Sequence, residues 1–219
     1  MKFDEWHPDY ESTVVERAKN GQDLSFLKQE EEMLKPWLET GKSLLDVGCA
    51  TAYSYYNFKK YGVDFRGVDI VNSYIEAGRK HLSEQGMEPS NLNCKSIYEL
   101  GKDDCCDIVI CNTMIQHLDE YSEALKKIAE VTGEVALVRT LTSDKTIIRK
   151  TITHTDTTIA DNLSNDGIPF NVYNEQDLKE ELLKHFSTVE IVPDSYTNEQ
   201  QVQIFEKDYY SYTIFKCLK

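Results

Sequence analysis

The sequence predicts an α/β fold with a doubly wound, mostly parallel seven-stranded sheet, helices on both faces and an antiparallel C-terminal strand pair. Three observations predict it. Strand-like and helix-like segments alternate five times between residues 42 and 141, with short connections. The segment 106–114 is apolar through its centre, as expected of a strand buried on both faces. Segments 187–196 and 209–218 are strand-like and separated by a polar loop, so they can pair as antiparallel neighbours.

The first helix is expected over residues 25–39, where apolar residues recur at helical spacing and Pro36 should break or kink the helix. Glycines at 62 and 86 are stop signals for the next two helices. The expected elements after the first helix are strand 42–48, helix 53–62, strand 64–71, helix 73–86, a short strand within 91–100, strand 106–114, helix 119–131 and strand 133–141.

The pattern changes after this core. Residues 142–173 are rich in Thr, Asp and Asn, show no strong period and are interpreted as an insertion or lid. An amphipathic helix is expected over 174–186, with Asn174 as its N-cap, and Asp119 is the expected N-cap of the helix 119–131.

The 219 residues suffice for one sizeable core, so a single domain is expected. Its expected parts are an N-terminal helical cap (1–40), a cofactor-binding core (43–141), the insertion (142–173), and the C-terminal helix with its strand pair (174–219). Oligomeric state is not readable from the sequence.

The formal net charge of −14 argues against nucleic acid and against an anionic membrane surface as partners, because both attract cationic surfaces. No apolar run approaches the length of a membrane span, and the N-terminus lacks the apolar stretch of a signal peptide. A cytoplasmic protein is therefore expected.

The six cysteines form no C-x-x-C pair and have no His cluster beside them, so no metal site is predicted. Cys94, Cys111 and Cys217 lie in apolar strand-like segments and are expected to be small core residues.

The loop "GCATA" after the first strand is the candidate floor of a ligand site. Ligands of open α/β sheets bind beyond the carboxyl ends of the strands. Gly48 allows the backbone to approach a ligand, and Ala50 and Ala52 are the next smallest choices. Asp69 ends the second strand 21 residues after Gly48, a spacing that suits an acid accepting hydrogen bonds from ribose hydroxyls. Together these features predict a nucleotide-like ligand.

Two nucleotide classes are disfavoured. The G-x-x-x-x-G-K-[ST] phosphate loop is absent, which weighs against nucleoside triphosphate hydrolysis. The dinucleotide fingerprint needs G-x-G-x-x-G, and the chain has "GCATAY" instead.

With these stretches in place, the chain resembles the class I S-adenosylmethionine-dependent methyltransferases of Rossmann-like fold. The resemblance is carried by "LLDVGCATA" (44–52), "GVDIVNSYIEAGRK" (67–80), "CDIVICNTMIQHLDE" (106–120) and "KKIAEVTGEVALV" (126–138), and it covers about residues 43–140. It implies S-adenosylmethionine as cofactor and S-adenosylhomocysteine as product.

The resemblance also implies roles for individual residues. Asp46, Gly48 and Ala50 would line the methionine end of the cofactor, and Asp69 would hold the ribose hydroxyls. Ile70 would pack on the adenine, Ser96 and Ile97 would lie at its edge, and Asn112 would face the reaction centre.

Two positions depart from the family pattern. Ala52 stands where glycine is usual, which leaves open a shifted loop or a somewhat tighter site. Ser96 stands where an acidic residue is common, so the adenine amino group would be held differently.

The expected reaction is an in-line methyl transfer, for which the protein mainly aligns the acceptor and excludes water. A general base helps when the acceptor is a hydroxyl or a protonated amine. His117 after the fourth strand and His154 in the insertion are the candidate bases. O- or N-methylation is therefore favoured over C-methylation.

Missing motifs narrow the possible classes of methyl acceptor. Neither the [DNS]-P-P-[FYW] sequence of DNA amino-methylation nor a Pro-Cys nucleophile pair is present, which favours a small molecule over nucleic acid, with protein second. A non-catalytic cofactor-binding protein and an NAD-dependent oxidoreductase stay as alternatives.

Overall fold

The computed structural model describes residues 8–22, 24–148, 150–151, 168–195, 202–205 and 208–219. Its helices, with short 3-10 turns marked η, are α2 (Pro8–Asn20), α3 (Ser25–Leu34), α4 (Tyr55–Phe58), η1 (Lys59–Tyr61), α5 (Asn72–Ser83), η2 (Pro89–Asn91), η3 (Ile97–Glu99), η4 (Lys102–Asp104), η5 (Ile115–His117), α6 (Ser122–Val131) and α7 (Glu175–Leu183). Its strands are β1 (Ser43–Val47), β2 (Asp64–Asp69), β3 (Leu92–Cys94), β4 (Cys106–Asn112), β5 (Thr132–Ser143), β6 (Lys150–Thr151), β7 (Ile168–Pro169), β8 (Tyr173–Asn174), β9 (Thr188–Pro193), β10 (Val202–Phe205) and β11 (Asp208–Leu218).

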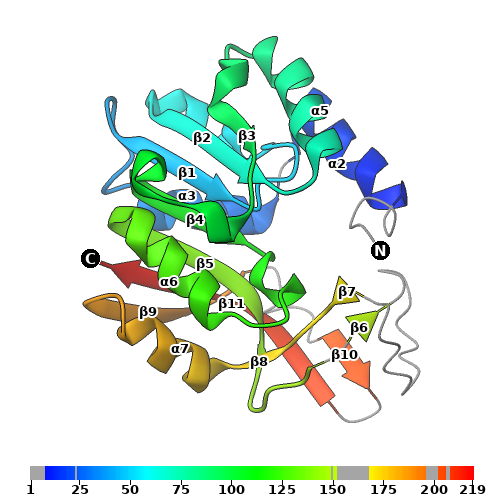
Figure 1. Ribbon diagram of the computed structural model, residues 1–219, viewed down its shortest axis with the longest axis vertical. Coiled ribbons are helices and arrows are strands. Elements are labelled where there is room, and N and C mark those ends of the chain that lie inside the picture. Colours follow the sequence, from blue (N-terminus) through cyan, green and yellow to red (C-terminus); the bar gives the residue numbers. More distant parts are fainter. Residues whose placement is uncertain (1–7, 23, 149, 152–167, 196–201, 206–207) are drawn as a thin grey trace.

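One sheet organises the part of the chain that the structure describes. Its order is β10-β11-β5-β4-β1-β2-β3, with β9 paired to β11 and the short β8 paired to β5. The strands β3, β2, β1, β4 and β5 are parallel, whereas β11 pairs antiparallel with both β5 and β9. The predicted mostly parallel sheet with an antiparallel C-terminal pair is confirmed, and the two short strands β8 and β10 extend it (Figure 1).

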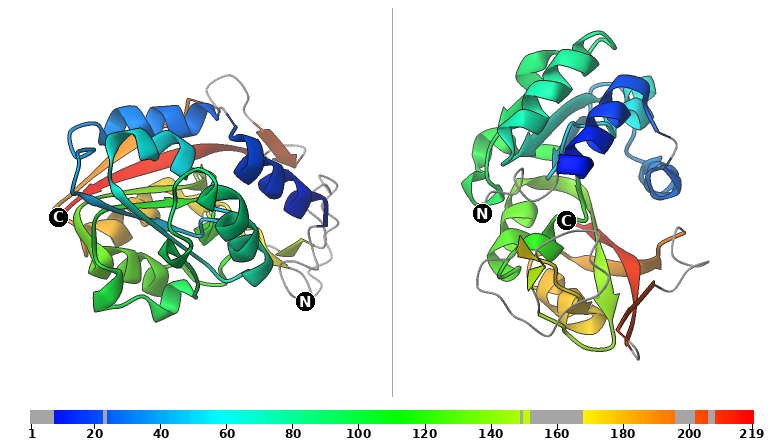
Figure 2. Two further views of the ribbon diagram at one scale, coloured as in Figure 1. Left: turned by 90° about the horizontal axis from the view of Figure 1, so that it is seen from above. Right: turned by 90° about the vertical axis from the view of Figure 1, so that its right-hand side faces the viewer.

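Helices cover both faces of the sheet because strand residues alternate between two cores. Leu45 and Val109 pack with residues of α6 and α7 on one face, and Leu44 and Ile108 pack with residues of α3, α4 and α5 on the other. Figure 2 shows this layering, with α3 on one side of the sheet and α6 and α7 on the opposite side. The predicted doubly wound fold is therefore confirmed.

The sheet reverses its winding between β1 and β4. The chain runs from β1 outward through β2 to β3, then returns to place β4 on the other side of β1. Loops that leave neighbouring strands in opposite directions open a crevice at their carboxyl ends, which is where this fold class binds ligands.

Most predicted elements are present, with local corrections. Pro36 ends the first helix early, so that α3 stops at Leu34. The expected helix 53–62 is only one α-turn followed by a 3-10 turn, and Gly62 ends it in a left-handed conformation as predicted. Asn174 caps α7 as predicted, because its side chain accepts hydrogen bonds from the N–H groups of Gln176 and Asp177.

Two predictions were wrong. Asp119 does not cap α6, because that helix begins at Ser122 and the Glu120 carboxylate accepts the Ser122 and Glu123 N–H groups. Cys94 is exposed, because β3 is the last strand at its edge of the sheet, whereas Cys111 and Cys217 are buried as expected.

Gly78 on α5 lets this helix pack closely on the loop after β1. A Cβ atom there would lie 2.7 Å from the Thr51 carbonyl oxygen and 2.8 Å from Leu92 Cδ1. We expect Gly78→Ala to lower the free energy of unfolding by roughly 1–3 kcal/mol, because this overpacking outweighs the helix propensity gained by alanine. Urea denaturation measures the change.

Gly101→Ala is the matched control. A Cβ atom at Gly101 meets nothing within 4 Å, and the backbone there is extended, so stability should stay within about 0.5 kcal/mol. Equal stability of the two variants would contradict the packing argument.

Candidate functional site

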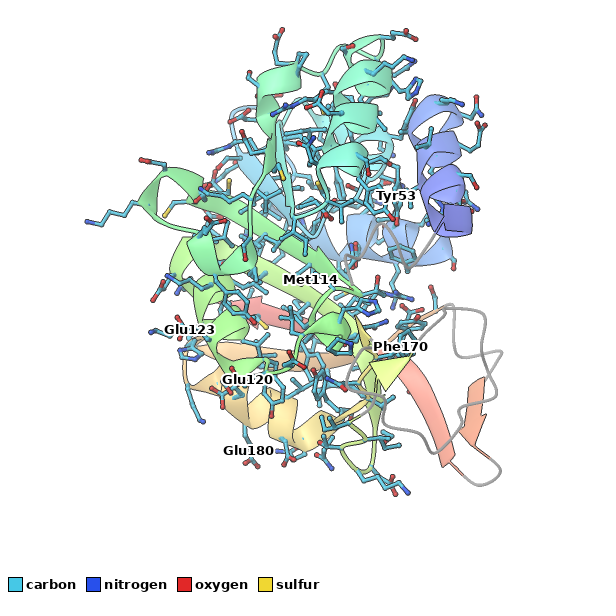
Figure 3. The ribbon with its side chains drawn as sticks, turned by 45° about the vertical axis from the view of Figure 1, so that its right-hand side comes forward. Tyr53, Met114, Glu120, Glu123, Phe170 and Glu180 are labelled. Atoms are coloured by element: carbon cyan, nitrogen blue, oxygen red, sulfur yellow. The ribbon has the colours of Figure 1, made fainter. Side chains whose placement is uncertain are left out.

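The loop after β1 passes closely beneath Met114. Gly48 has φ +74°, and a Cβ atom there would lie 2.6 Å from Met114 Cγ and 2.7 Å from Met114 Cβ. Both the conformation and the space therefore require glycine at this position. In Figure 3, Met114 lies between Tyr53 and Phe170, on the side of the molecule where β4 ends.

Two alanines of this loop adopt the left-handed conformation that favours glycine. Ala50 has φ +50° and Ala52 has φ +56°. Such a conformation costs a non-glycine residue about 1–2 kcal/mol, so packing and hydrogen bonds must offset it. Ala52 is fully buried, and its N–H donates to the Cys49 carbonyl oxygen at 2.7 Å. The alanine is thus accommodated within a glycine-like backbone.

Asp69 links this loop to the end of β2. Its Oδ2 accepts the Ala50 N–H at 2.8 Å and its Oδ1 accepts the Val71 N–H at 2.9 Å. Burial raises the pKa of Asp69, while these backbone hydrogen bonds lower it. Each carboxylate oxygen has a second lone pair, so Asp69 can also accept hydrogen bonds from ligand hydroxyls.

A cavity of about 660 Å³ opens above this loop at the carboxyl ends of the strands. Seven of the eight residues predicted to hold a cofactor line it: Gly48, Ala50, Asp69, Ile70, Ser96, Ile97 and Asn112. The cavity continues past them to Arg17, Phe26, Tyr53, Met114, Gln116, His117, Arg139 and Tyr212, among others. One continuous cavity therefore contains nearly the whole predicted site.

Asp46 lies beneath the loop and is not among the residues that line the cavity. Its carboxylate accepts a hydrogen bond from the Ser54 hydroxyl. Burial is the main cause that raises the pKa of Asp46 to about 7, with the hydrogen bond from Ser54 opposing the rise and the nearby Asp69 charge adding to it. In this conformation Asp46 supports the loop from below.

The side of the cavity near β2 and β3 has one apolar edge. Ile70 is 64% exposed, which is unusual for an isoleucine and leaves its side chain available to a flat ligand. Ser96 accepts the Tyr98 N–H as the cap of η3, and Ile97 is buried. The Ser96 hydroxyl is therefore partly committed to the turn.

Glu30 was missed by the sequence reasoning. It is fully buried, and its Oε2 accepts a hydrogen bond from Asn112 Nδ2 at 3.1 Å. Burial raises the pKa of Glu30 to about 8, with the Asp46 and Asp194 charges adding to the rise and Asn112 and Arg139 opposing it. The sequence contained a signal, since Glu30 falls at helical spacing between the buried Leu27 and Leu34.

Arg139 lies within β5 and forms a buried ion pair with Asp194. Its guanidinium also lies 4.3 Å from the centre of the Phe26 ring and 3.8 Å from that of Tyr212. The Arg139 charge is therefore paired with a carboxylate of the same chain. No sequence pattern indicates Asp194 as the partner of Arg139, because the two residues are 55 positions apart.

His117 lines the same cavity from η5. Its Nδ1 lies 2.9 Å from the Pro169 carbonyl oxygen, which can only accept, so Nδ1 carries the proton and Nε2 is the basic nitrogen in the neutral ring. Gln116 Nε2 lies 3.4 Å from that atom. His154, the other candidate base, lies outside the described residues.

Two further absences concern only the described residues. They contain no group of three or more His, Cys, Asp or Glu side chains placed to hold a metal ion. None of their helices has the length and apolar character needed to cross a membrane.

Residues 45–134 match the family model described as a methyltransferase domain. Ubiquinone biosynthesis O-methyltransferase of Pasteurella multocida is 26% identical over 130 residues, which are 55% of this chain and 51% of the relative. The chain thus aligns with about half the length of that curated relative, and the same enzyme of Coxiella burnetii, 31% identical over 90 residues, is covered to 38%.

Solved structures share the fold along most of the chain. Magnesium protoporphyrin IX methyltransferase of Synechocystis with bound S-adenosylhomocysteine has a TM-score of 0.65 at 15% identity, covering 98% of this chain and 96% of that one. The cyclase SpnF has a TM-score of 0.62 at 14% identity, covering 87% and 80%. The chain therefore has the Rossmann-like fold of class I S-adenosylmethionine-dependent methyltransferases, and the predicted resemblance is confirmed.

The raised pKa of Glu30 predicts a pH dependence of stability. Below its unfolded value of 4.5 the carboxyl is neutral in both states, and between 4.5 and about 8 only the unfolded state releases its proton. This carboxyl therefore makes stability fall as pH rises through that window. We expect Glu30→Gln to gain stability relative to the wild type between about pH 5 and pH 8, measured by urea denaturation.

Glu31→Gln is the control on the same helix, because Glu31 is paired with Lys60 and Tyr61 and its pKa is lowered. Its difference from the wild type should not grow in the neutral range. A pH-independent difference for Glu30→Gln would contradict the assignment.

Proposed function

We propose that the protein is an S-adenosylmethionine-dependent methyltransferase that transfers a methyl group to a small-molecule acceptor, with O- or N-methylation favoured. The observation that carries the proposal is one continuous cavity at the carboxyl ends of β1, β2 and β4, which joins seven of the eight predicted cofactor residues to His117. The methyltransferase-domain match over 45–134 supports the same reading.

The residues at this edge fit the cofactor. Gly48 lines the cavity without a side chain, Asp69 offers acceptor oxygens for two ribose hydroxyls, and the exposed Ile70 offers an apolar surface to the adenine. When bound, S-adenosylmethionine supplies a methyl group that the sulfonium charge activates for in-line displacement.

The chain's own residues then position the acceptor and accept its proton. His117 Nε2 is the base that takes the proton of an acceptor hydroxyl, while the Pro169 carbonyl oxygen holds Nδ1–H and so fixes the ring orientation. The acceptor end of the cavity is bounded by the aromatic rings of Phe26 and Tyr212, which exclude water from the reacting atoms.

The cavity that would hold both cofactor and acceptor has a volume of about 660 Å³, within the 300–1,000 Å³ typical of small-molecule sites, which supports a small-molecule acceptor. The net charge of −14 opposes nucleic acid. A protein acceptor is the second candidate. The cytoplasmic location stays a prediction.

We expect the wild type to bind S-adenosylhomocysteine and Asp69→Asn to bind it at least tenfold more weakly, because the substitution replaces a charged acceptor of the ribose hydroxyls. Isothermal titration calorimetry measures both affinities. Asp64→Asn, at the exposed start of the same strand, should bind like the wild type.

The same calorimeter tests the dinucleotide alternative. Tight binding of NAD without any response to S-adenosylhomocysteine would refute the proposal in favour of an oxidoreductase.

We expect incubation with methyl-labelled S-adenosylmethionine and a metabolite extract of the native host to label a small molecule. His117→Gln should lower the initial rate by about 10²–10⁴-fold if the acceptor is a hydroxyl, with S-adenosylhomocysteine affinity unchanged. The control is His81→Gln on α5, which is not among the residues lining the cavity. Label that never appears across extracts would favour a non-catalytic binding protein.

A further inference from the structure

The Glu30 carboxyl lies directly behind the wall of the cofactor cavity. Asn112 lines the cavity and Glu30 does not, yet the two side chains are joined by the hydrogen bond from Asn112 Nδ2 to Glu30 Oε2. Glu30 comes from α3, which precedes the matched domain 45–134, and Asn112 ends β4 within it. Glu30, which lies outside the matched domain, thus contacts Asn112, which lies inside it, at the wall of the cavity.

This hydrogen bond fixes the orientation of the Asn112 amide. An ionised carboxylate can only accept, so it selects the amide rotamer that turns the NH₂ group toward Glu30. The carbonyl oxygen Oδ1 of Asn112 then remains available to accept a hydrogen bond from another group. A protonated Glu30 could donate to Oδ1 instead, which would favour the flipped amide.

Two acceptor atoms at this contact lack partners among the described residues. Asn112 Oδ1 and Glu30 Oε1 are both buried, and neither has a hydrogen-bond partner there. Unsatisfied buried acceptors are costly, and in native proteins each calls for a specific explanation. Two acceptors with no donor between them are suited to a ligand that brings N–H groups and positive charge.

We propose that Glu30 is a positioning residue for the cofactor: its buried carboxylate holds the Asn112 amide so that Oδ1 accepts a hydrogen bond from the ammonium of the cofactor's amino-acid end. This inference rests on the proposed function and deepens it. The adenosine end is held elsewhere, at Asp69 and Ile70, so Glu30 acts on only one end of the ligand.

The surrounding charges complement a cationic ligand. Asp46 on β1 and Asp194 after β9 raise the pKa of Glu30, whereas Asn112 on β4 and Arg139 on β5 lower it. Arg139 is already neutralised by Asp194. A bound ammonium adds a positive charge that favours the ionised form of the Glu30 carboxyl, so binding of the amino-acid end should release a proton near neutral pH.

The test compares two ligands that share adenosine and a thioether. S-adenosylhomocysteine carries the amino-acid end and 5′-methylthioadenosine lacks it. We expect Glu30→Gln to weaken S-adenosylhomocysteine binding about tenfold and to leave 5′-methylthioadenosine binding unchanged, both measured by calorimetry. In an Asn112→Ala background, Glu30→Gln should add no further loss. Glu31→Gln should change neither affinity.

Equal effects of Glu30→Gln on both ligands, or no effect on either, would overturn the inference while leaving the proposed function intact. A wild type that binds neither ligand would instead refute the proposed function. If the Glu30→Gln variant does not fold, the pH dependence of ligand binding by the wild type tests the inference. Its affinity for S-adenosylhomocysteine relative to 5′-methylthioadenosine should rise between about pH 6 and pH 8.5, and a flat ratio would overturn the inference.

Discussion

The carboxylate of Asp69 is the contact on which the site depends. By accepting the Ala50 and Val71 N–H groups, it joins the loops that follow β1 and β2 into one rim. Ala50 is held at φ +50° within this rim, so the hydrogen bond helps to offset an unfavourable conformation. Because the loop backbone is fixed in this way, Gly48 can pass under Met114 and the cavity stays open above it.

A second constraint is the burial of charge behind this rim. Asp46 and Glu30 are buried carboxyls whose pKa values are raised to about 7 and about 8. The buried Arg139 is compensated by Asp194, so it leaves little positive charge for the two acids. Buried charges without full compensation weaken a fold, and they persist most often where a ligand uses them. The burial of these two acids behind the cavity is thus consistent with the cationic ligand proposed above.

Sequence reasoning predicted what local patterns determine. The β/α alternation predicted the parallel sheet. One wall of the cavity was predicted from Gly48 in the loop after β1 and from Asp69 at the end of β2. The Glu120 cap of α6 was missed because neighbouring acids compete for the same N–H groups, and the outcome depends on the loop path. Asp194 could not be predicted as the partner of Arg139, because their contact spans 55 residues and exists only once β9 and β5 share a sheet.

The two ends of the cavity come from different parts of the chain. Gly48, Asp69 and Asn112 all lie within the matched domain 45–134. Phe26, Arg139 and Tyr212, which bound the other end, lie outside it. The proposed cofactor end is thus tied to strand ends whose geometry the sheet dictates. The proposed acceptor end includes residues of an N-terminal helix and a C-terminal strand, which can change without disturbing the parallel strands.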